Sequence, residues 1–193
     1  MDSVSGWARG IFGEVAGAVA KAVPACLRRA HERARNGQEG VHTQTLEAYG
    51  HGLHAVQYEE LAAALAPYGD PVRLQGRTLM LVSGHLLYPL RYAAKDVPVT
   101  AARLRSATGF RAELIRRHGP EPQQLALDLA LGPEPVPDVP PDLALLPEDV
   151  RLVLIAYACS LERGVMRAEW GDAELRREDR YLVWHHHEPL LGG

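Results

Sequence analysis

Cysteine and lysine are scarce in this chain. Among 193 residues only Cys26 and Cys159 are cysteines, and only Lys21 and Lys95 are lysines. The two cysteines match neither a metal-knuckle nor a redox spacing, so the sequence predicts no disulfide framework and favours a reducing compartment, the cytoplasm. Arginine replaces lysine almost throughout, alongside abundant Ala, Gly and Pro. This bias is typical of high-GC coding, so arginine by itself is weak evidence of phosphate recognition.

Long uninterrupted apolar runs are also missing. Residues 11–27 are rich in Ala and Val, but Glu14 and Lys21 interrupt them and Pro24 ends the run. A signal peptide and a membrane span are therefore not expected, because a span needs about 20 apolar residues. The length suits one soluble domain that forms its core without disulfides.

The common catalytic signatures are absent from the sequence. It contains no Gly-x-Ser-x-Gly elbow, no P-loop and no Gly-x-Gly-x-x-Gly turn. Neither lysine stands in the Glu-x-Lys hairpin by which many metal-dependent nucleases hold a metal and polarise water. The sequence therefore favours a non-catalytic interaction protein, although an enzyme stays an alternative.

Apolar spacing predicts two long N-terminal helices. The first spans 4–36, where Pro24 either kinks the helix or starts a second one and Gly37 is the stop. The second spans 44–66, with Thr43 or Thr45 as its cap. Its Gly50 and Gly52 indicate a close backbone approach or local weakness.

Short apolar runs separated by glycine predict the strands. Residues 72–74, 78–82 and 86–90 form an antiparallel meander, in which Pro89 indicates an edge or a bulge. Strands are expected again at 151–159, which is central, and at 164–170 and 180–186. Short helices are expected at 100–106, where Thr100 is the cap, and at 108–118. The connector 119–148 holds eight of the 14 prolines, a short helix at 123–131 and a polyproline-like stretch at 133–141.

We therefore expect a single α+β domain over residues 1–193. Its N-terminal helices pack on an antiparallel sheet formed from two β-rich segments. Along the chain, the parts are helical (1–70), a basic meander with helices (71–118), the proline-rich connector (119–148) and β-rich (149–193).

Charge is distributed unevenly, although the net charge is only -3. Residues 71–118 carry nine basic and two acidic side chains, whereas residues 119–193 carry six basic and 14 acidic ones. One interpretation is a surface that docks a polyanion such as nucleic acid, or an acidic protein partner. The other is a scaffold with internally neutralised charge, in which residues 142–188 cover the basic segment.

The polyanion hypothesis rests on arginines interleaved with aromatic residues, here Tyr88, Tyr92 and Phe110. Aromatic rings can stack on bases while arginines hold phosphates. The expected binding residues are Arg77, Arg91, Arg103, Arg105, Arg111, Arg116 and Arg117.

A second hypothesis is a hydrolase with a divalent metal as cofactor. Glu47, His51 and His54 share a face of the second helix, where i and i+3 histidines can ligate one ion. Further ligands could come from His185 and His187, which point the same way in a strand.

Gln57 and Glu60 are polar residues within the apolar face of the same helix. A carboxylate in that position needs a partner or has a raised pKa. Arg91 or another strand arginine is the expected partner of Glu60. Both residues are also candidates for a catalytic role, because perturbed acids concentrate at functional sites.

Overall fold

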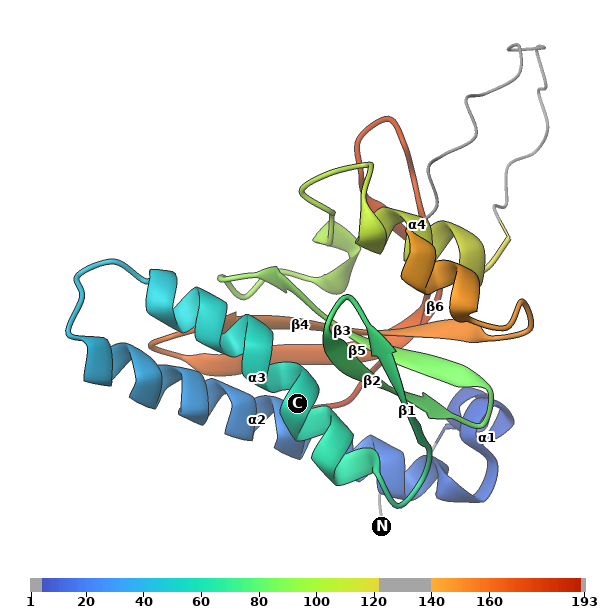
Figure 1. Ribbon diagram of the computed structural model, residues 1–193, viewed down its shortest axis with the longest axis horizontal. Coiled ribbons are helices and arrows are strands. Elements are labelled where there is room, and N and C mark those ends of the chain that lie inside the picture. The colour runs from blue at the N-terminus through green and yellow to red at the C-terminus, as the bar shows by residue number, and fades with distance from the viewer. Residues whose placement is uncertain (1–4, 122–139, 192–193) are drawn as a thin grey trace.

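The computed structural model describes residues 5–121 and 140–191 (Figure 1). Six strands form one sheet in the order β1-β2-β3-β4-β5-β6: β1 (Asp70–Leu74), β2 (Arg77–Val82), β3 (His85–Ala93), β4 (Arg151–Ser160), β5 (Gly164–Leu175) and β6 (Leu182–Pro189). The α+β architecture, the meander and the joining of two β-rich segments are confirmed. The predicted helix 123–131 and most of the polyproline-like stretch lie outside the described residues.

The two β-rich segments join through a parallel pair of strands. β3 pairs with β4 in parallel from His85/Arg151 to Ala93/Ala158, whereas the other four pairings are antiparallel. The predicted antiparallel sheet is confirmed at the other four pairings, and this joint is the exception. The long connection over 94–150 allows the parallel arrangement, since parallel neighbours need a crossover of a dozen or more residues.

Pro89 was predicted to indicate an edge strand or a bulge. The edge strand is wrong, because β3 lies inside the sheet, and the register irregularity of β3 lies between Arg91 and Ala93. On one side β3 pairs with β4 throughout, with Pro89 opposite Ile155. On the other side its pairing with β2 ends at Met80/Leu87. Beyond Leu87 the strand has no ladder partner on the β2 side, which is where a residue without an amide proton is tolerated.

Three helices cover one face of the sheet: α1 (Gly6–Phe12), α2 (Ala16–Val41) and α3 (Glu47–Leu65). Val23, Leu27, Leu53 and Trp170 are among the buried residues of the core on this face. Pro24 neither ends nor divides α2, and the helix runs four residues past the expected stop at Gly37. It ends at His42 in the left-handed conformation.

Gln38 explains why neither threonine caps α3. Its buried side chain donates to the carbonyls of Thr43 and Thr45 and accepts from the Tyr49 amide. Tyr49 is the third residue of α3, whose amide lacks a partner within the helix. A residue of the preceding helix thus supplies the cap, and the same bonds hold the last turn of α2.

The opposite face is covered by α4 (Phe110–His118), by η3 (Pro141–Leu145) and by the segment after η2 (Val99–Ala101). The predicted helix 100–106 is wrong, because the helical part is a single 3-10 turn that ends at Ala101. Residues 102–105 are extended because they pair with residues 180–182: the Leu182 amide donates to Ala102 and the Leu104 amide to Arg180. Ala102 and Leu104 are buried, whereas Arg103 and Arg105 face outward.

Residues Gly6–Val41 form the one helical stretch of the described chain that is long and apolar enough to cross a membrane. Core helices of soluble proteins and signal sequences share this composition. In the fold, Val19, Val23 and Leu27 of this stretch are fully buried in the core.

Candidate anion-binding pocket

A cavity of about 460 Å³ opens where β2 separates from β3. Arg77 and Leu79 of β2 line one side, and β3 contributes Tyr88 and residues 90–93. His54 and Tyr58 of α3 form a wall. Residues 103–106, Thr108 and the start of α4 complete the rim. The cavity is thus built from parts of the chain that lie far apart in sequence.

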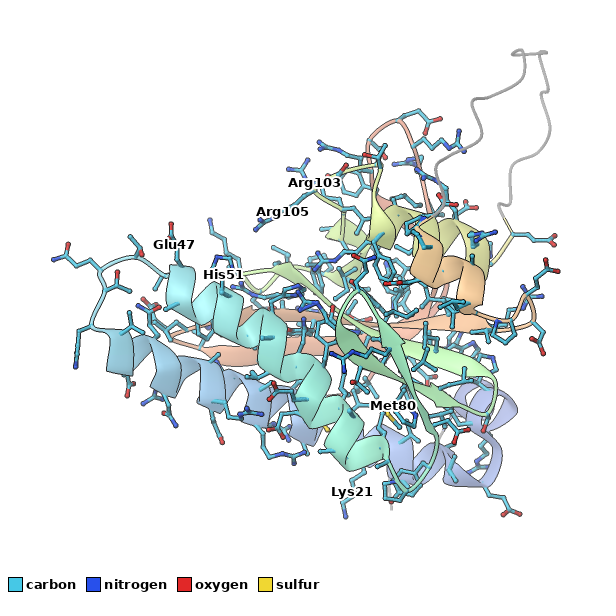
Figure 2. The ribbon with its side chains drawn as sticks, viewed as in Figure 1. Lys21, Glu47, His51, Met80, Arg103 and Arg105 are labelled. Carbon is cyan, nitrogen blue, oxygen red and sulfur yellow. The ribbon has the colours of Figure 1, made fainter. Side chains whose placement is uncertain are left out.

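Five of the seven predicted binding arginines line this cavity: Arg77, Arg91, Arg103, Arg105 and Arg111. Among the described residues that line the cavity there is no aspartate or glutamate. Arg103 and Arg105 are exposed, and Figure 2 shows them projecting outward from the segment between β3 and α4. Arg77, Arg91 and Arg111 are half-buried. The pocket therefore has an exposed cationic rim and a half-buried cationic interior.

The other two predicted arginines do not belong to the pocket. Arg116 lies near the Glu113 carboxylate, at 3.5 Å, and also donates to the Ala107 carbonyl. Arg117 is exposed on α4 and is absent from the cavity lining. On an α-helix these residues point away from Arg111, which faces the cavity.

The predicted aromatic residues Tyr88, Tyr92 and Phe110 all line the cavity. Tyr88 is buried and its hydroxyl accepts from Arg111, whereas Tyr92 and Phe110 are half-buried. Burial raises the pKa of Tyr92 to about 12, so its phenol is neutral at physiological pH. Tyr92 and Phe110 are therefore the two rings that a ligand could reach.

His54 is held in one tautomer by its neighbours. Its Nδ1 lies 3.1 Å from Gln57 Nε2 and 3.4 Å from an Arg111 nitrogen. Both neighbours can only donate, so Nδ1 accepts and the proton of the neutral ring is on Nε2. Burial, followed by the charges of Arg77, Arg111 and His51, lowers the pKa of His54 to about 4. His54 is therefore a neutral donor at pH 7.

Gln57 is buried, as its position on the apolar face predicts, and it anchors this wall. It accepts a 2.7 Å hydrogen bond from the hydroxyl of the fully buried Tyr157 and donates to His54.

Glu60 is also paired, but the prediction that Arg91 is its partner was wrong. Glu60 binds Arg29 and Arg33 of α2, which lower its pKa. Through these ion pairs Glu60 connects α3 to α2, and it does not line the cavity.

The predicted metal ligands are not assembled into a metal centre. Among the residues that the structure describes, no three His, Cys, Asp or Glu side chains are placed to hold an ion. Glu47 and His51 are exposed on α3 and project away from α2 (Figure 2). His185 lies 3.7 Å from Glu174 and His187 lies 2.7 Å from Glu169, so both pair with strand β5. The hypothesis of a metal-dependent hydrolase thus gains no support.

Ser106 and Thr108 also line the pocket, and sequence reasoning missed them. No spacing pattern singles them out, because they lie in an irregular segment. Tyr58, which the sequence spacing places on the same helix face as His54, also lines the pocket.

No protein-family model, curated protein or solved structure matches this chain.

Proposed function

We propose that this protein is a non-catalytic binding protein whose pocket holds the phosphates of a nucleic acid. The observation that carries the proposal is the convergence of five arginines on one cavity, with no carboxylate among the described residues of its lining. Uncompensated guanidinium groups repel one another, and an anion in the cavity relieves that repulsion. Arginine is also suited to bidentate contacts with phosphate oxygens.

The aromatic residues favour nucleic acid over an acidic protein. Tyr92 and Phe110 lie in the same cavity as the arginines and are half-buried, so each has accessible ring surface. Bases stack on such rings, with a contribution of about 1–3 kcal/mol per base. An acidic peptide would use the arginines but would gain little from the rings.

The scaffold with internally neutralised charge fits the pocket poorly. None of the five lining arginines forms an ion pair with a carboxylate in residues 5–121 or 140–191. The acidic C-terminal part contributes Asp142 near this region, and that carboxylate accepts from Gln75 and not from an arginine.

Reversing one rim charge tests the proposal. Arg103→Glu should weaken binding of a labelled single-stranded oligonucleotide by roughly tenfold, since a charged contact contributes about 1.5–3 kcal/mol. It should also lower the salt slope, because fewer counterions are released. Fluorescence anisotropy over a series of salt concentrations measures both quantities.

Arg73→Glu is the matched control. Arg73 is an exposed arginine of β1 in the same basic segment, and it does not line the cavity. Its substitution by Glu changes the net charge by the same amount as Arg103→Glu. A salt-independent affinity, or an equal loss in both variants, would contradict binding at the pocket. Tighter binding of a polyglutamate peptide than of the oligonucleotide would instead identify an acidic protein as the partner.

A further inference from the structure

The arginines inside the pocket are held by neutral groups. Arg111 donates through Nε to the Tyr88 hydroxyl at 2.9 Å, and its terminal nitrogen lies 3.4 Å from His54 Nδ1. Arg91 donates through Nε to the Cys159 carbonyl at 2.8 Å. These contacts fix the position of each guanidinium group and leave its charge uncompensated.

Aromatic rings complete this arrangement. The guanidinium carbon of Arg77 lies 5.2 Å from the centroid of the Tyr58 ring, and that of Arg91 lies 5.7 Å from the Tyr49 ring. Such cation–π contacts position a cation without neutralising it. Three half-buried positive charges therefore line one cavity, and residues 5–121 and 140–191 place no carboxylate beside them.

Several arginines elsewhere in the fold are paired with carboxylates. Arg29, Arg33 and Arg167 are examples, and each lies within 3 Å of a carboxylate oxygen. The five pocket arginines have no such partner among the described residues. The pocket lining adds further donors to these arginines, namely the Nε2 proton of neutral His54 and the hydroxyls of Ser106 and Thr108.

We propose that this pocket recognises a phosphomonoester, the terminal phosphate of a single strand or of a free nucleotide, in preference to an internal phosphodiester. The proposal rests on the proposed nucleic-acid binding and specifies which phosphate is held. A monoester carries a charge of about -1.5 to -2 at pH 7 and three free acceptor oxygens. A diester carries a single charge and two free oxygens.

Charge matching and donor count both favour the monoester. Three half-buried cations with no acidic partner are better compensated by two negative charges than by one, because their interaction in a partly desolvated site is strong. Three terminal oxygens can also accept from more of the converging donors than two can.

The size of the cavity agrees with this ligand. A volume of about 460 Å³ lies in the range of small-ligand pockets, which starts near 300 Å³. It suits one nucleotide unit. A double helix is far wider than such a cavity, so its internal phosphates could reach only the rim arginines Arg103 and Arg105.

Binding of three forms of one oligonucleotide tests the inference. The 5′-phosphorylated, 3′-phosphorylated and unphosphorylated strands of the same sequence are compared by anisotropy. We expect at least one phosphorylated end to bind about tenfold or more tightly than the unphosphorylated strand, the effect of one added charged contact. Competition with a nucleoside monophosphate then distinguishes a strand terminus from a free nucleotide as the ligand. If the monophosphate displaces the labelled strand only weakly, the ligand is a strand terminus. If it displaces the labelled strand as effectively as the unlabelled phosphorylated strand does, the ligand is a free nucleotide.

Arg111→Gln should abolish the preference for the phosphorylated end. Arg117→Gln is its control, because it removes an exposed arginine of the same helix that does not line the cavity. Should Arg111→Gln fail to fold, Arg103→Gln at the exposed rim provides the second variant, and we expect it to reduce the preference. Equal binding of all three strands, with the salt dependence and the Arg103→Glu effect intact, would overturn this inference and leave the proposed function standing. Absence of binding to all strands and to the monophosphate would overturn both.

Discussion

At the scale of single residues, His54 shows how the pocket controls protonation. The ring is half-buried beside two arginines from other elements, Arg77 of β2 and Arg111 of α4, and beside His51 of its own helix. Burial and these positive charges disfavour the imidazolium form. Protonation of His54 therefore reports on the charge inside the pocket.

The free protein should lose stability as the pH falls from about 6.5 to about 4. The pKa of His54 is about 4 in the folded chain and 6.5 when it is unperturbed, so the unfolded chain binds more protons in that window. Above this pH window the His54 ring is neutral in both the folded and the unfolded chain. Below the window the loss of folding stability caused by His54 is complete. Chemical denaturation at a series of pH values measures the effect, and His54→Gln should remove its share of the slope. An NMR titration that gives His54 an ordinary pKa would contradict this account.

A bound phosphate should raise the pKa of His54, because its negative charge favours the imidazolium form. Comparing the titration of the ring in the free and the bound protein therefore places the ligand near His54. The same titration would show no change for a ligand held only by the exposed rim.

At the scale of elements, the pocket exists because two strands separate. β2 and β3 pair only from Met80/Leu87 to Val82/His85, and the unpaired parts of both strands line the cavity. Helix α3 crosses beside this opening and contributes His54 and Tyr58. A meander paired along its whole length would close the gap by which a ligand enters.

Two glycine-to-alanine substitutions test different properties of the elements: one tests the helix propensity of α3, and the other tests the close approach of β5 and β6. Gly50 lies in α3 with open space where a Cβ would be, so Gly50→Ala should stabilise the fold by about 0.5–1 kcal/mol. At Gly171 in β5 a Cβ would collide with the backbone of His186 and His187 on β6. Gly171→Ala should therefore be strongly destabilising and should loosen the β5–β6 pair.

Thermal and chemical denaturation of the two variants measure these opposite effects. A destabilised Gly50→Ala protein would show that α3 approaches another backbone there, and a neutral Gly171→Ala protein would show that β5 and β6 are farther apart than described.

At the scale of the whole molecule, the net charge and the local charge have opposite signs. The chain carries a net charge of -3, whereas the described lining of its pocket holds five arginines and no acidic residue. Attraction of a polyanion therefore depends on the local field of the pocket, which salt screens over about 10 Å at 0.1 M.

Rim and interior arginines should affect different rate constants. Arg105 is exposed at the rim, so Arg105→Ala should mainly slow association and reduce its dependence on salt. Arg111 is half-buried and fixed by Tyr88, so Arg111→Ala should mainly speed dissociation. Stopped-flow measurement of both rate constants at two ionic strengths distinguishes these effects. Identical changes in the two variants would contradict the division into rim and interior.

The strands and long helices could be predicted because apolar spacing directly reflects burial. The run from Arg151 to Cys159 is apolar on both faces, and it forms the central strand β4. The helix ends were predicted less well, since Gln38 caps α3 across a loop and no local pattern signals such a contact. The extended form of Ala102 and Leu104 likewise depends on residues 180–182.

The sequence by itself determined the α+β class, the basic segment 71–118 and the arginines available to an anion, because composition and periodicity are local properties. Only the tertiary structure decided which of those arginines meet. Arg111 faces the cavity while Arg117 of the same helix does not, and Glu60 pairs with Arg29 of α2 while Arg91 is left without a carboxylate partner among the described residues. These outcomes depend on the separation of β2 from β3 and on the packing of α2 against α3, which arise from contacts between residues far apart in the chain.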